Sequence, residues 1–367
     1  MYKSFKYRIY PTKSQSEFLD KQFGMCRFMY NYFLDLQIKS YAENKLYLSK
    51  YTLQKEIPKL KIKKEYKWLN EGMSQALCRE SENLDKAFTG FFKKKTRFPK
   101  FKSKKTDSKS FTIPQKFKIE NNRLILPKIG KVKIILHRDI PINKFTSCTI
   151  CKTPTNKYFA SITFEINEII PINQPIDENQ AVGIDLGIKT FATISDGSII
   201  ENPKYLRKSL KRLKRLSKQH SKRVKDSKNK EKSRIKLALV YEKIKNQRKD
   251  FLQKTTTNLI QRYNTICLET LKIKNMVKNH NLALSLLDLG IGQFNQLIEY
   301  KAKQKGKNIL RIGTFAPSSK MCSCGVLNNE LTLKDRTWTC KSCNTLNNRD
   351  LLAANNIKKF AFIKDQA

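Results

Sequence analysis

The sequence predicts an α+β protein with more than one domain. Its 367 residues, of which 39% are hydrophobic, can bury a sizeable core, and a chain of this length ordinarily folds as roughly two or three units. Apolar residues at helical spacing fill one long segment, whereas short runs with the alternation of strands lie on both sides of it. The polar segment PINQPIDENQ (171–180) contains two prolines and marks a boundary between two halves.

The first half is expected to form a small β-barrel interrupted by helices. YKSFKYRIYP alternates as a strand does and stops at Pro11. Apolar residues then recur at helical spacing, and short strands return after the basic segment that contains FPKFKSKK. We therefore expect residues 1–12 and 96–170 to form the barrel and residues 13–95 to form a helical insertion.

The second half, residues 181–367, is expected to form another domain after the linker at 171–180. AVGIDL and TFATIS indicate paired strands joined by a tight turn, and NTICLETL indicates a further short buried strand. Residues 203–252 predict a basic helical hairpin with one apolar stripe on each helix. The first stripe contains Leu206, Leu210, Leu213 and Leu216, and the second contains Ile235, Leu239, Tyr241 and Ile244.

The net charge indicates a polyanionic partner. Lysine and arginine number 75 against 31 aspartate and glutamate residues, which gives a formal net charge of +44. A polyanion would neutralise this self-repulsion, so nucleic acid is the expected partner. A membrane surface also attracts cations, but the sequence has no apolar run of spanning length and no signal-peptide segment behind MYKSFKYRIY. We therefore expect a cytoplasmic protein without a membrane partner.

Two basic segments are candidates for nucleic-acid contact. A charge run is ordinarily a solvated face, yet residues 203–252 have so few acids to pair their lysines that we prefer a nucleic-acid groove there. In residues 93–111, Phe98, Phe101 and Phe111 are interleaved with lysines, and aromatic rings can stack on unpaired bases. Because phenylalanines in a strand-rich domain usually pack in the core, we expect the lysines to contact phosphates and most of these rings to be buried.

The few histidines exclude several nuclease chemistries. A nuclease of the His-Asn-His type needs at least two histidines placed together, and single-strand transposases with paired histidines and a tyrosine need the same. The three histidines of this chain, His137, His220 and His280, are isolated in the sequence. Each is expected to be a surface or boundary residue.

Three acids stand in apolar settings. Asp185 lies in AVGIDL, Glu269 ends NTICLE, and Asp350 begins the helical pattern NRDLLAANNI. A buried carboxylate is costly unless it is paired or binds a metal, and one alone is more often capped or salt-bridged than catalytic. Three in this order fit the ribonuclease-H-like fold, in which such positions meet at one edge of a mixed sheet. There they hold two divalent ions for phosphodiester cleavage.

Nine cysteines are expected to stay reduced, and two close pairs indicate metal ligands. CSCG at 322–325 and CKSC at 340–343 outline a zinc ribbon, in which four thiolates surround one ion. The pair Cys148 and Cys151 has no partner pair, so these thiols are expected to pack or to lie on the surface. Core positions are expected for Cys26, Cys78 and Cys267.

These motifs resemble those of the TnpB family, the OrfB-type transposon-encoded proteins related to type V CRISPR effectors. The resemblance rests on GIDLGIKTFATISDG, CLETLKIKNMVKNH, FAPSSKMCSCG, LTLKDRTWTCKSC and NRDLLAANNI, and it covers nearly the whole chain. It implies an RNA-guided DNA endonuclease. A wedge-like β-barrel and a helical recognition domain would bind guide RNA and a short motif beside the double-stranded DNA target, while a RuvC-type domain cuts the DNA.

The chain departs from the family pattern at two places. Family members usually have two residues between the first two zinc ligands, whereas only Ser323 separates Cys322 from Cys324. The family commonly has an acid two positions before the last catalytic one, and this chain has Asn348 there. Asp350 itself is present, so we do not interpret Asn348 as a loss of activity.

The sequence therefore predicts an RNA-guided, Mg²⁺-dependent DNA endonuclease. Asp185, Glu269 and Asp350 are the expected catalytic ligands of two Mg²⁺ ions, and Cys322, Cys324, Cys340 and Cys343 are the expected ligands of one structural Zn²⁺ in a ribbon at 318–346. A nuclease-dead RNA-guided repressor and a cut-and-paste transposase stay open as alternatives. The usual acid order of such transposases is Asp, Asp, Glu. No heptad pattern predicts an oligomeric state.

Overall fold

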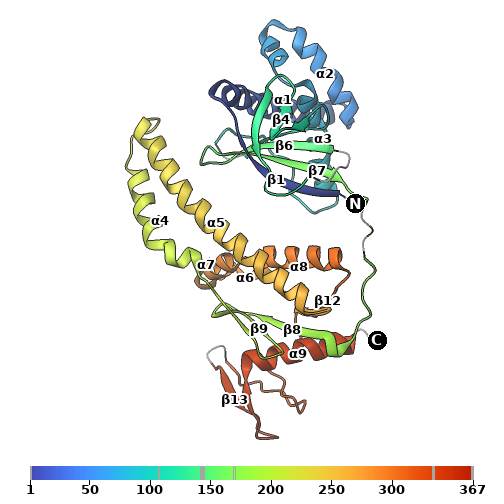
Figure 1. Ribbon diagram of the computed structural model, residues 1–367, viewed down its shortest axis with the longest axis vertical. Coiled ribbons are helices and arrows are strands. Elements are labelled where there is room, and N and C mark those ends of the chain that lie inside the picture. Colours follow the sequence, from blue (N-terminus) through green and yellow to red (C-terminus); the bar gives the residue numbers. More distant parts are fainter. Residues whose placement is uncertain are drawn as a thin grey trace. The chain divides into compact units, whose positions relative to one another are not determined.

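The computed structural model describes residues 2–105, 108–140, 145–167, 169, 171–332 and 335–364. The chain divides into two units, Met1–Glu168 and Ile169–Ala367, called here the amino-terminal and carboxy-terminal units (Figure 1). Separate clusters of buried apolar side chains stabilise the two units. Among the helices in the described ranges, none combines the length and the apolar character of a membrane span.

An antiparallel sheet forms the centre of the amino-terminal unit. In the described chain its strands follow the order β2-β6-β7-β1-β5-β4-β3. The first strand lies between β7 and β5, with Lys6 opposite Ser161 and Ile9 opposite Ile134. The bounds are β1 Tyr2–Tyr10, β2 Lys109–Ile113, β3 Lys118–Glu120, β4 Arg123–Leu126, β5 Gly130–Ile135, β6 Phe145–Lys152 and β7 Tyr158–Glu165.

The sheet is an open half-barrel, a coarser form of the small β-barrel that the sequence predicted. In the described residues, β2 and β3 are the two edges and do not pair with each other. The helices α1 (Lys13–Asn44) and α3 (Ser74–Phe92) contact β2, and the rings of Phe23 and Phe111 lie 5.3 Å apart. The helices α1 and α3 therefore pack against β2, the strand at one end of the sheet.

Helices fill most of the segment between β1 and β2. Besides α1 and α3 they include α2 (Lys50–Ile62) and the 3-10 helix η1 (Lys64–Glu71). Thr12 begins α1 with a capping box: its hydroxyl accepts from the Gln15 amide at 3.3 Å, and the Gln15 side chain accepts from the Thr12 amide at 3.0 Å. This cap fixes where β1 ends and the helical segment starts.

A mixed sheet forms the centre of the carboxy-terminal unit. Its strands, counted in the described residues, follow the order β10-β9-β8-β11-β12. The first three form an antiparallel meander, whereas β11 runs parallel to both β8 and β12. The bounds are β8 Ala181–Leu186, β9 Thr190–Ile194, β10 Ile199–Glu201, β11 Thr265–Glu269 and β12 Asn308–Ile312.

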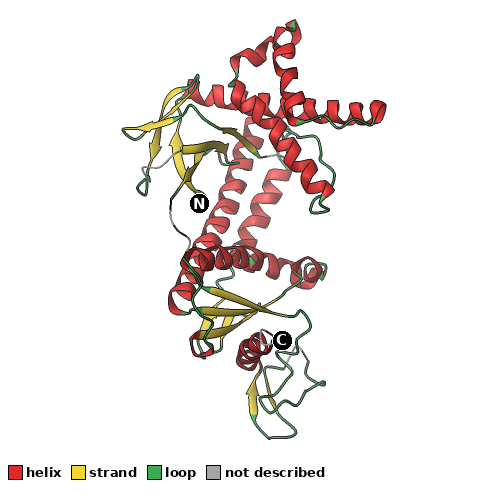
Figure 2. Cartoon of the chain, turned by 90° about the vertical axis from the view of Figure 1, so that its right-hand side faces the viewer, coloured by secondary structure: helices red, strands yellow, loops and turns green. Residues whose placement is uncertain are grey.

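Helices cover both faces of this sheet (Figure 2). Alternate residues of β11 divide between the faces: Ile266 and Leu268 pack in the cluster that includes α5 (Lys228–Arg262) and α8 (Ile291–Lys305), whereas Cys267 packs against α9 (Arg349–Lys364). The helix α9 crosses β8 so closely that a Cβ at Gly183 would lie 2.8 Å from the Lys358 amide nitrogen. Only glycine fits there, which explains the first glycine of VGIDLG.

The remaining elements of the carboxy-terminal unit are peripheral. The helix α4 (Tyr205–Ser221) packs along α5 as the predicted hairpin, and the short helices α6 (Ile273–Met276) and α7 (His280–Leu289) follow β11. Two short strands, β13 (Thr337–Thr339) and β14 (Leu346–Asn348), pair just before α9.

Candidate active site and metal centre

Two of the three predicted acids come from neighbouring parallel strands. Asp185 is the fifth residue of β8, and Glu269 is the last residue of β11. The register places Leu268 opposite Ile184, so the next residue on each strand is one of the acids. Both carboxylates therefore lie at the carboxyl-terminal end of the sheet, on equivalent positions of adjacent strands.

The third acid, Asp350, lies in the first turn of α9. The Asn348 side-chain oxygen accepts from the amides of Asp350 and Leu351 at 3.1 and 3.2 Å, so Asn348 caps the helix. Asn348, which stands where the family commonly has an acid, thus serves as the cap of α9. Asp350 also accepts a hydrogen bond from the Arg336 guanidinium at 3.3 Å.

The charges of the other two acids act on Asp185. Burial raises the pKa of Asp185 to about 7, with the negative charges of Glu269 and Asp350 acting in the same direction. Arg349 and Arg336 oppose this rise in pKa. Among the described residues, the side chains gathered closely enough to hold a metal ion are the four cysteines, whose sulfur atoms all lie within 4.8 Å of one another, and the three acids do not form such a group.

A serine that the sequence analysis missed holds Glu269. The Ser318 hydroxyl donates to Glu269 Oε1 at 2.5 Å, and Ser318 is itself buried. Asn356 of α9, also buried, donates its side-chain amide to the carbonyls of Ser318 and Met321 at 2.7 and 2.6 Å. The available signals were the serines of FAPSSKMCSCG and an asparagine on the apolar face of α9.

The four cysteines of the predicted ribbon lie together. Cys322 and Cys343 have sulfur atoms 3.6 Å apart, and the sulfur atoms of Cys324 and Cys340 are also 3.6 Å apart. Four sulfurs at about 2.3 Å from a tetrahedral Zn²⁺ would be separated by about 3.8 Å, so the thiols fit this ion. A hydrogen bond from the Cys324 amide lowers the pKa of the Cys322 thiol to about 6, which favours the thiolate that binds metals.

The segment from Cys322 to Cys324, which is one residue shorter than the family pattern, lies in a tight turn. The Gly325 amide donates to the Cys322 carbonyl, and the Cys322 amide donates to the Val326 carbonyl, both at 2.9 Å. Gly325 has φ of +91°, a conformation that favours glycine. This turn brings Cys324 to the other thiols although only Ser323 separates it from Cys322.

The other five cysteines form no disulfide within the described residues. The predicted packing role fits Cys148, which is buried in β6, whereas Cys151 on the same strand is half-buried. Cys26 and Cys267 lie in the core as predicted. Cys78 on α3 is half-buried and packs against the core of the amino-terminal unit, so it lies at the margin of that core rather than inside it.

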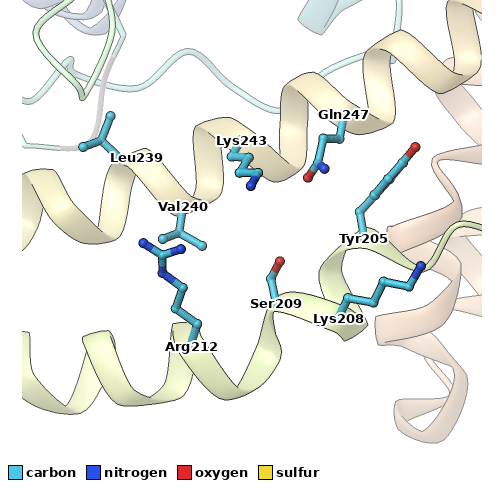
Figure 3. A pocket seen from close by; sticks show the side chains of 8 residues that line it. All are labelled: Tyr205, Lys208, Ser209, Arg212, Leu239, Val240, Lys243 and Gln247. Carbon is cyan, nitrogen blue, oxygen red and sulfur yellow. The ribbon is translucent and has the colours of Figure 1, made fainter.

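The basic hairpin encloses a groove of about 400 Å³ between α4 and α5 (Figure 3). Its lining includes Lys208 and Arg212 of α4 and Lys243 of α5. On the buried side, Leu213 packs against Val240 and Ile244. The predicted second stripe was wrong at two positions, since Leu239 and Tyr241 are 44% and 53% exposed.

The basic aromatic segment differs from its prediction. Phe111 is buried in β2, but Phe98 and Phe101 are 46% and 55% exposed. Most of these rings are therefore not in the core. Residues 93–105 lie outside the regular strands, so the two rings have no sheet face that would bury them.

Comparison with known proteins shows the family of this chain. Residues 161–280 match the OrfB_IS605 family model, described as "Probable transposase". A protein of Streptomyces pristinaespiralis named "Putative RNA-guided DNA endonuclease" is 32% identical over 97% of this chain and 88% of its own length. The chain belongs to the TnpB family. "Putative RNA-guided DNA endonuclease InsQ" of Escherichia coli K12 is 29% identical over 96% of this TnpB-family chain and 91% of its own length.

Further matches cover both ends of this TnpB-family protein. Residues 1–45 match a model described as a helix-turn-helix domain, and the elements within this range are β1 and the long helix α1. Residues 292–357 match the "Cas12f1-like, TNB domain". The fold is similar to that of Cas12f1 in a complex with sgRNA and target DNA, with a TM-score of 0.52, 14% identity and 98% of each chain covered.

Proposed function

We propose that this TnpB-family protein is an RNA-guided DNA endonuclease whose catalytic carboxylates are Asp185, Glu269 and Asp350. The observation that supports this most directly is the arrangement of two acids on adjacent parallel strand ends beside a third in the first turn of α9. The mixed sheet with helices on both faces fits a ribonuclease-H-like, RuvC-type nuclease domain. RNA guidance and the DNA substrate come from the printed names of the relatives.

The carboxylates fit Mg²⁺, because they are hard oxygen donors whose mutual repulsion a cation would relieve. When bound, two such ions activate the attacking water and stabilise the departing 3′ oxygen. Asp185, Glu269 and Asp350 would hold them, and the Ser318 hydroxyl orients the Glu269 carboxylate. Cys322, Cys324, Cys340 and Cys343 would hold one structural Zn²⁺ beside the helix that carries Asp350.

The amino-terminal unit is proposed to hold the guide. Its half-barrel, the strands β1 to β7, would act as the wedge that was expected for residues 1–12 and 96–170, and the helices within residues 13–95 would be the recognition insertion. Together they would bind guide RNA and read a short motif beside the double-stranded DNA target. The net charge of +44 is consistent with two polyanionic partners.

Plasmid cleavage by protein purified with and without co-expressed guide RNA tests this function. Asp185→Ala, Glu269→Ala and Asp350→Ala should each abolish cleavage and leave RNA and target binding largely intact. Asp196→Asn is the matched control, because Asp196 accepts from Arg262 and Tyr263 near the opposite end of β11. A wild-type cleavage rate in any of the three alanine variants would contradict the site assignment.

The same assay separates the alternatives. Target binding without cleavage by the wild-type protein would indicate a repressor. Joined donor and target strands would indicate a transposase, in line with the description of the family model. RNA-independent cutting would contradict the proposed guide.

A further inference from the structure

The chain reverses direction immediately after α3. Lys94 has φ of +55°, and the amides of Lys95 and Thr96 donate to the Gly90 carbonyl at 2.9 and 3.2 Å. A Cβ at Gly90 would lie 2.9 Å from the Thr96 hydroxyl, so the returning chain packs directly on the last turn of the helix. Residues 88–101, called here the aromatic turn, therefore have a defined conformation.

Two rings of the aromatic turn are anchored and yet exposed. Phe98 packs edge-to-face on buried Phe88 and on Phe91, with ring centroids 5.6 and 5.4 Å apart. Phe92 stacks on Phe88 at 6.1 Å. Despite these contacts Phe92 is 64% exposed and Phe98 is 46% exposed. Each ring is thus held by its neighbours while much of its surface faces solvent.

Cations flank these rings in the sequence. Between residues 93 and 100 the exposed cations are Lys93, Lys94, Lys95, Arg97 and Lys100, and residues 86–105 contain no acid. In the part of the chain that the structure describes, none of these five cations has an ion pair within 4.0 Å. The aromatic turn thus presents apolar ring surface among unneutralised positive charges, which suits a ligand that is both planar and anionic.

We propose that the aromatic turn binds unpaired nucleotides of the guide RNA, with Phe92 and Phe98 stacking on bases and the flanking cations contacting phosphates. This rests on the proposed function, which supplies the RNA. The bases of duplex target DNA are already stacked, whereas folded RNA exposes unpaired bases in loops and junctions. Nucleotides combine the flat apolar face and the negative charge that this surface complements.

Binding of fluorescently labelled oligouridine and of a mixed-sequence RNA duplex to the full chain, freed of RNA, tests the proposal. The double variant Phe92→Leu/Phe98→Leu keeps apolar side chains without aromatic faces, and Phe92→Tyr/Phe98→Tyr keeps the aromatic faces. The leucine variant should bind oligouridine at least about tenfold more weakly, with duplex binding unchanged. The tyrosine variant should bind oligouridine as the wild type does.

The cations are tested separately. Lys95→Ala/Arg97→Ala should reduce the slope of log affinity against log salt for oligouridine by about 1.4, since each phosphate contact to a single strand contributes about 0.7. The leucine variant should keep the wild-type slope. Equal thermal unfolding midpoints for the variants and the wild type control for folding.

Two outcomes would overturn the inference: unchanged oligouridine affinity in the leucine variant, or equal losses for oligouridine and duplex. Cosedimentation with phosphatidylglycerol vesicles, lost in the leucine variant while oligouridine binding persists, would assign the surface to lipid instead. If the wild-type protein copurifies with guide RNA and cleaves DNA, any of these outcomes contradicts only the inference about the aromatic turn. If it recovers no RNA and does not cleave, the proposed function itself is wrong.

Discussion

Glu269 depends on a hydroxyl that lies 49 residues further along the chain. Ser318 donates to its carboxylate, and Asn356 of α9 fixes the backbone of Ser318 from the other side. The helix whose first turn contains Asp350 therefore also positions the loop that orients Glu269. Ser318 and Asn356 thus form a chain of hydrogen bonds from Glu269 to the helix that contains Asp350.

We expect Ser318→Ala to weaken metal binding at Glu269. The lost hydrogen bond frees the carboxylate to rotate, and partners of this kind typically change metal affinity or activity by about 10- to 100-fold. The Mg²⁺ concentration for half-maximal cleavage should rise, and Mn²⁺ binding measured by calorimetry should weaken in parallel.

Ser318→Thr should restore both properties because it keeps the hydroxyl. Ser319→Ala is the matched control on the neighbouring, half-buried serine. An unaltered Mg²⁺ dependence in Ser318→Ala would contradict the positioning role.

Asp185 is expected to destabilise the metal-free fold. Its pKa rises from 3.8 in the unfolded reference to about 7 in the folded protein. The folded state therefore holds its proton more tightly, and the free energy of unfolding falls as pH rises between these values. In chelator at pH 8, Asp185→Asn should unfold a few degrees higher than wild type, and this difference should shrink toward zero near pH 4.

Thermal scans of both proteins across this pH range measure the effect, and cleavage should be lost in Asp185→Asn. A lower midpoint for this variant at pH 8 would show that the ionised carboxylate stabilises the fold.

At the scale of elements, α9 and the hairpin have different roles. The helix α9 lies against β8 at Gly183, is capped by Asn348 and starts directly after the two-stranded ribbon. The hairpin extends the crossover between β10 and β11, and it buries only a small apolar seam. His220 of α4 and Ser233 of α5 make a 2.8 Å hydrogen bond across it. Most of the hairpin surface is therefore not used for packing and can carry charged side chains.

The hairpin groove is expected to bind phosphates. Replacing Lys208, Arg212 and Lys243 by glutamine should weaken binding of the guide–target duplex and lower the salt slope by up to about 2.7, at about 0.9 per phosphate contact. Lys254→Gln is the control, because Lys254 already pairs with Asp250 at 2.8 Å on α5. Binding should be measured by filter retention at several salt concentrations. If affinity and slope stay at wild-type values, the hairpin is only a solvated surface.

At the scale of the whole molecule, the two units are stabilised by apolar cores, whereas the ribbon has few buried apolar side chains. The chain carries a net charge of +44, and each unit has its own apolar core. The ribbon has a small cluster of Cys322, Trp338, Cys340 and Leu352, too few apolar side chains to hold the segment by burial alone. A metal ion would supply the missing stabilisation.

We expect about one zinc ion per chain in protein purified without chelator. Elemental analysis should show its loss in Cys340→Ser, together with loss of cleavage, because only six residues separate Cys343 from Asp350. Cys151→Ser, on a half-buried thiol of the amino-terminal unit, should keep both zinc and activity. A fully active protein without zinc would show that the ribbon is stable without metal.

The sequence by itself determined the features that depend on residues close together in the chain, namely the positions of strands, helices and cysteine pairs. Strand alternation, helical spacing and cysteine spacing located β8, β11, α9 and the four gathered thiols, and acids at strand ends were expected to meet at one sheet edge. The tertiary structure decided exposure and long-range partnership. Whether Val240 or Leu239 faces α4, whether Phe98 is buried, and that Ser318 meets Glu269 depend on segments far apart in the chain. Local periodicity carries no record of such segments, because burial and hydrogen bonding are set by whichever element covers a residue after folding.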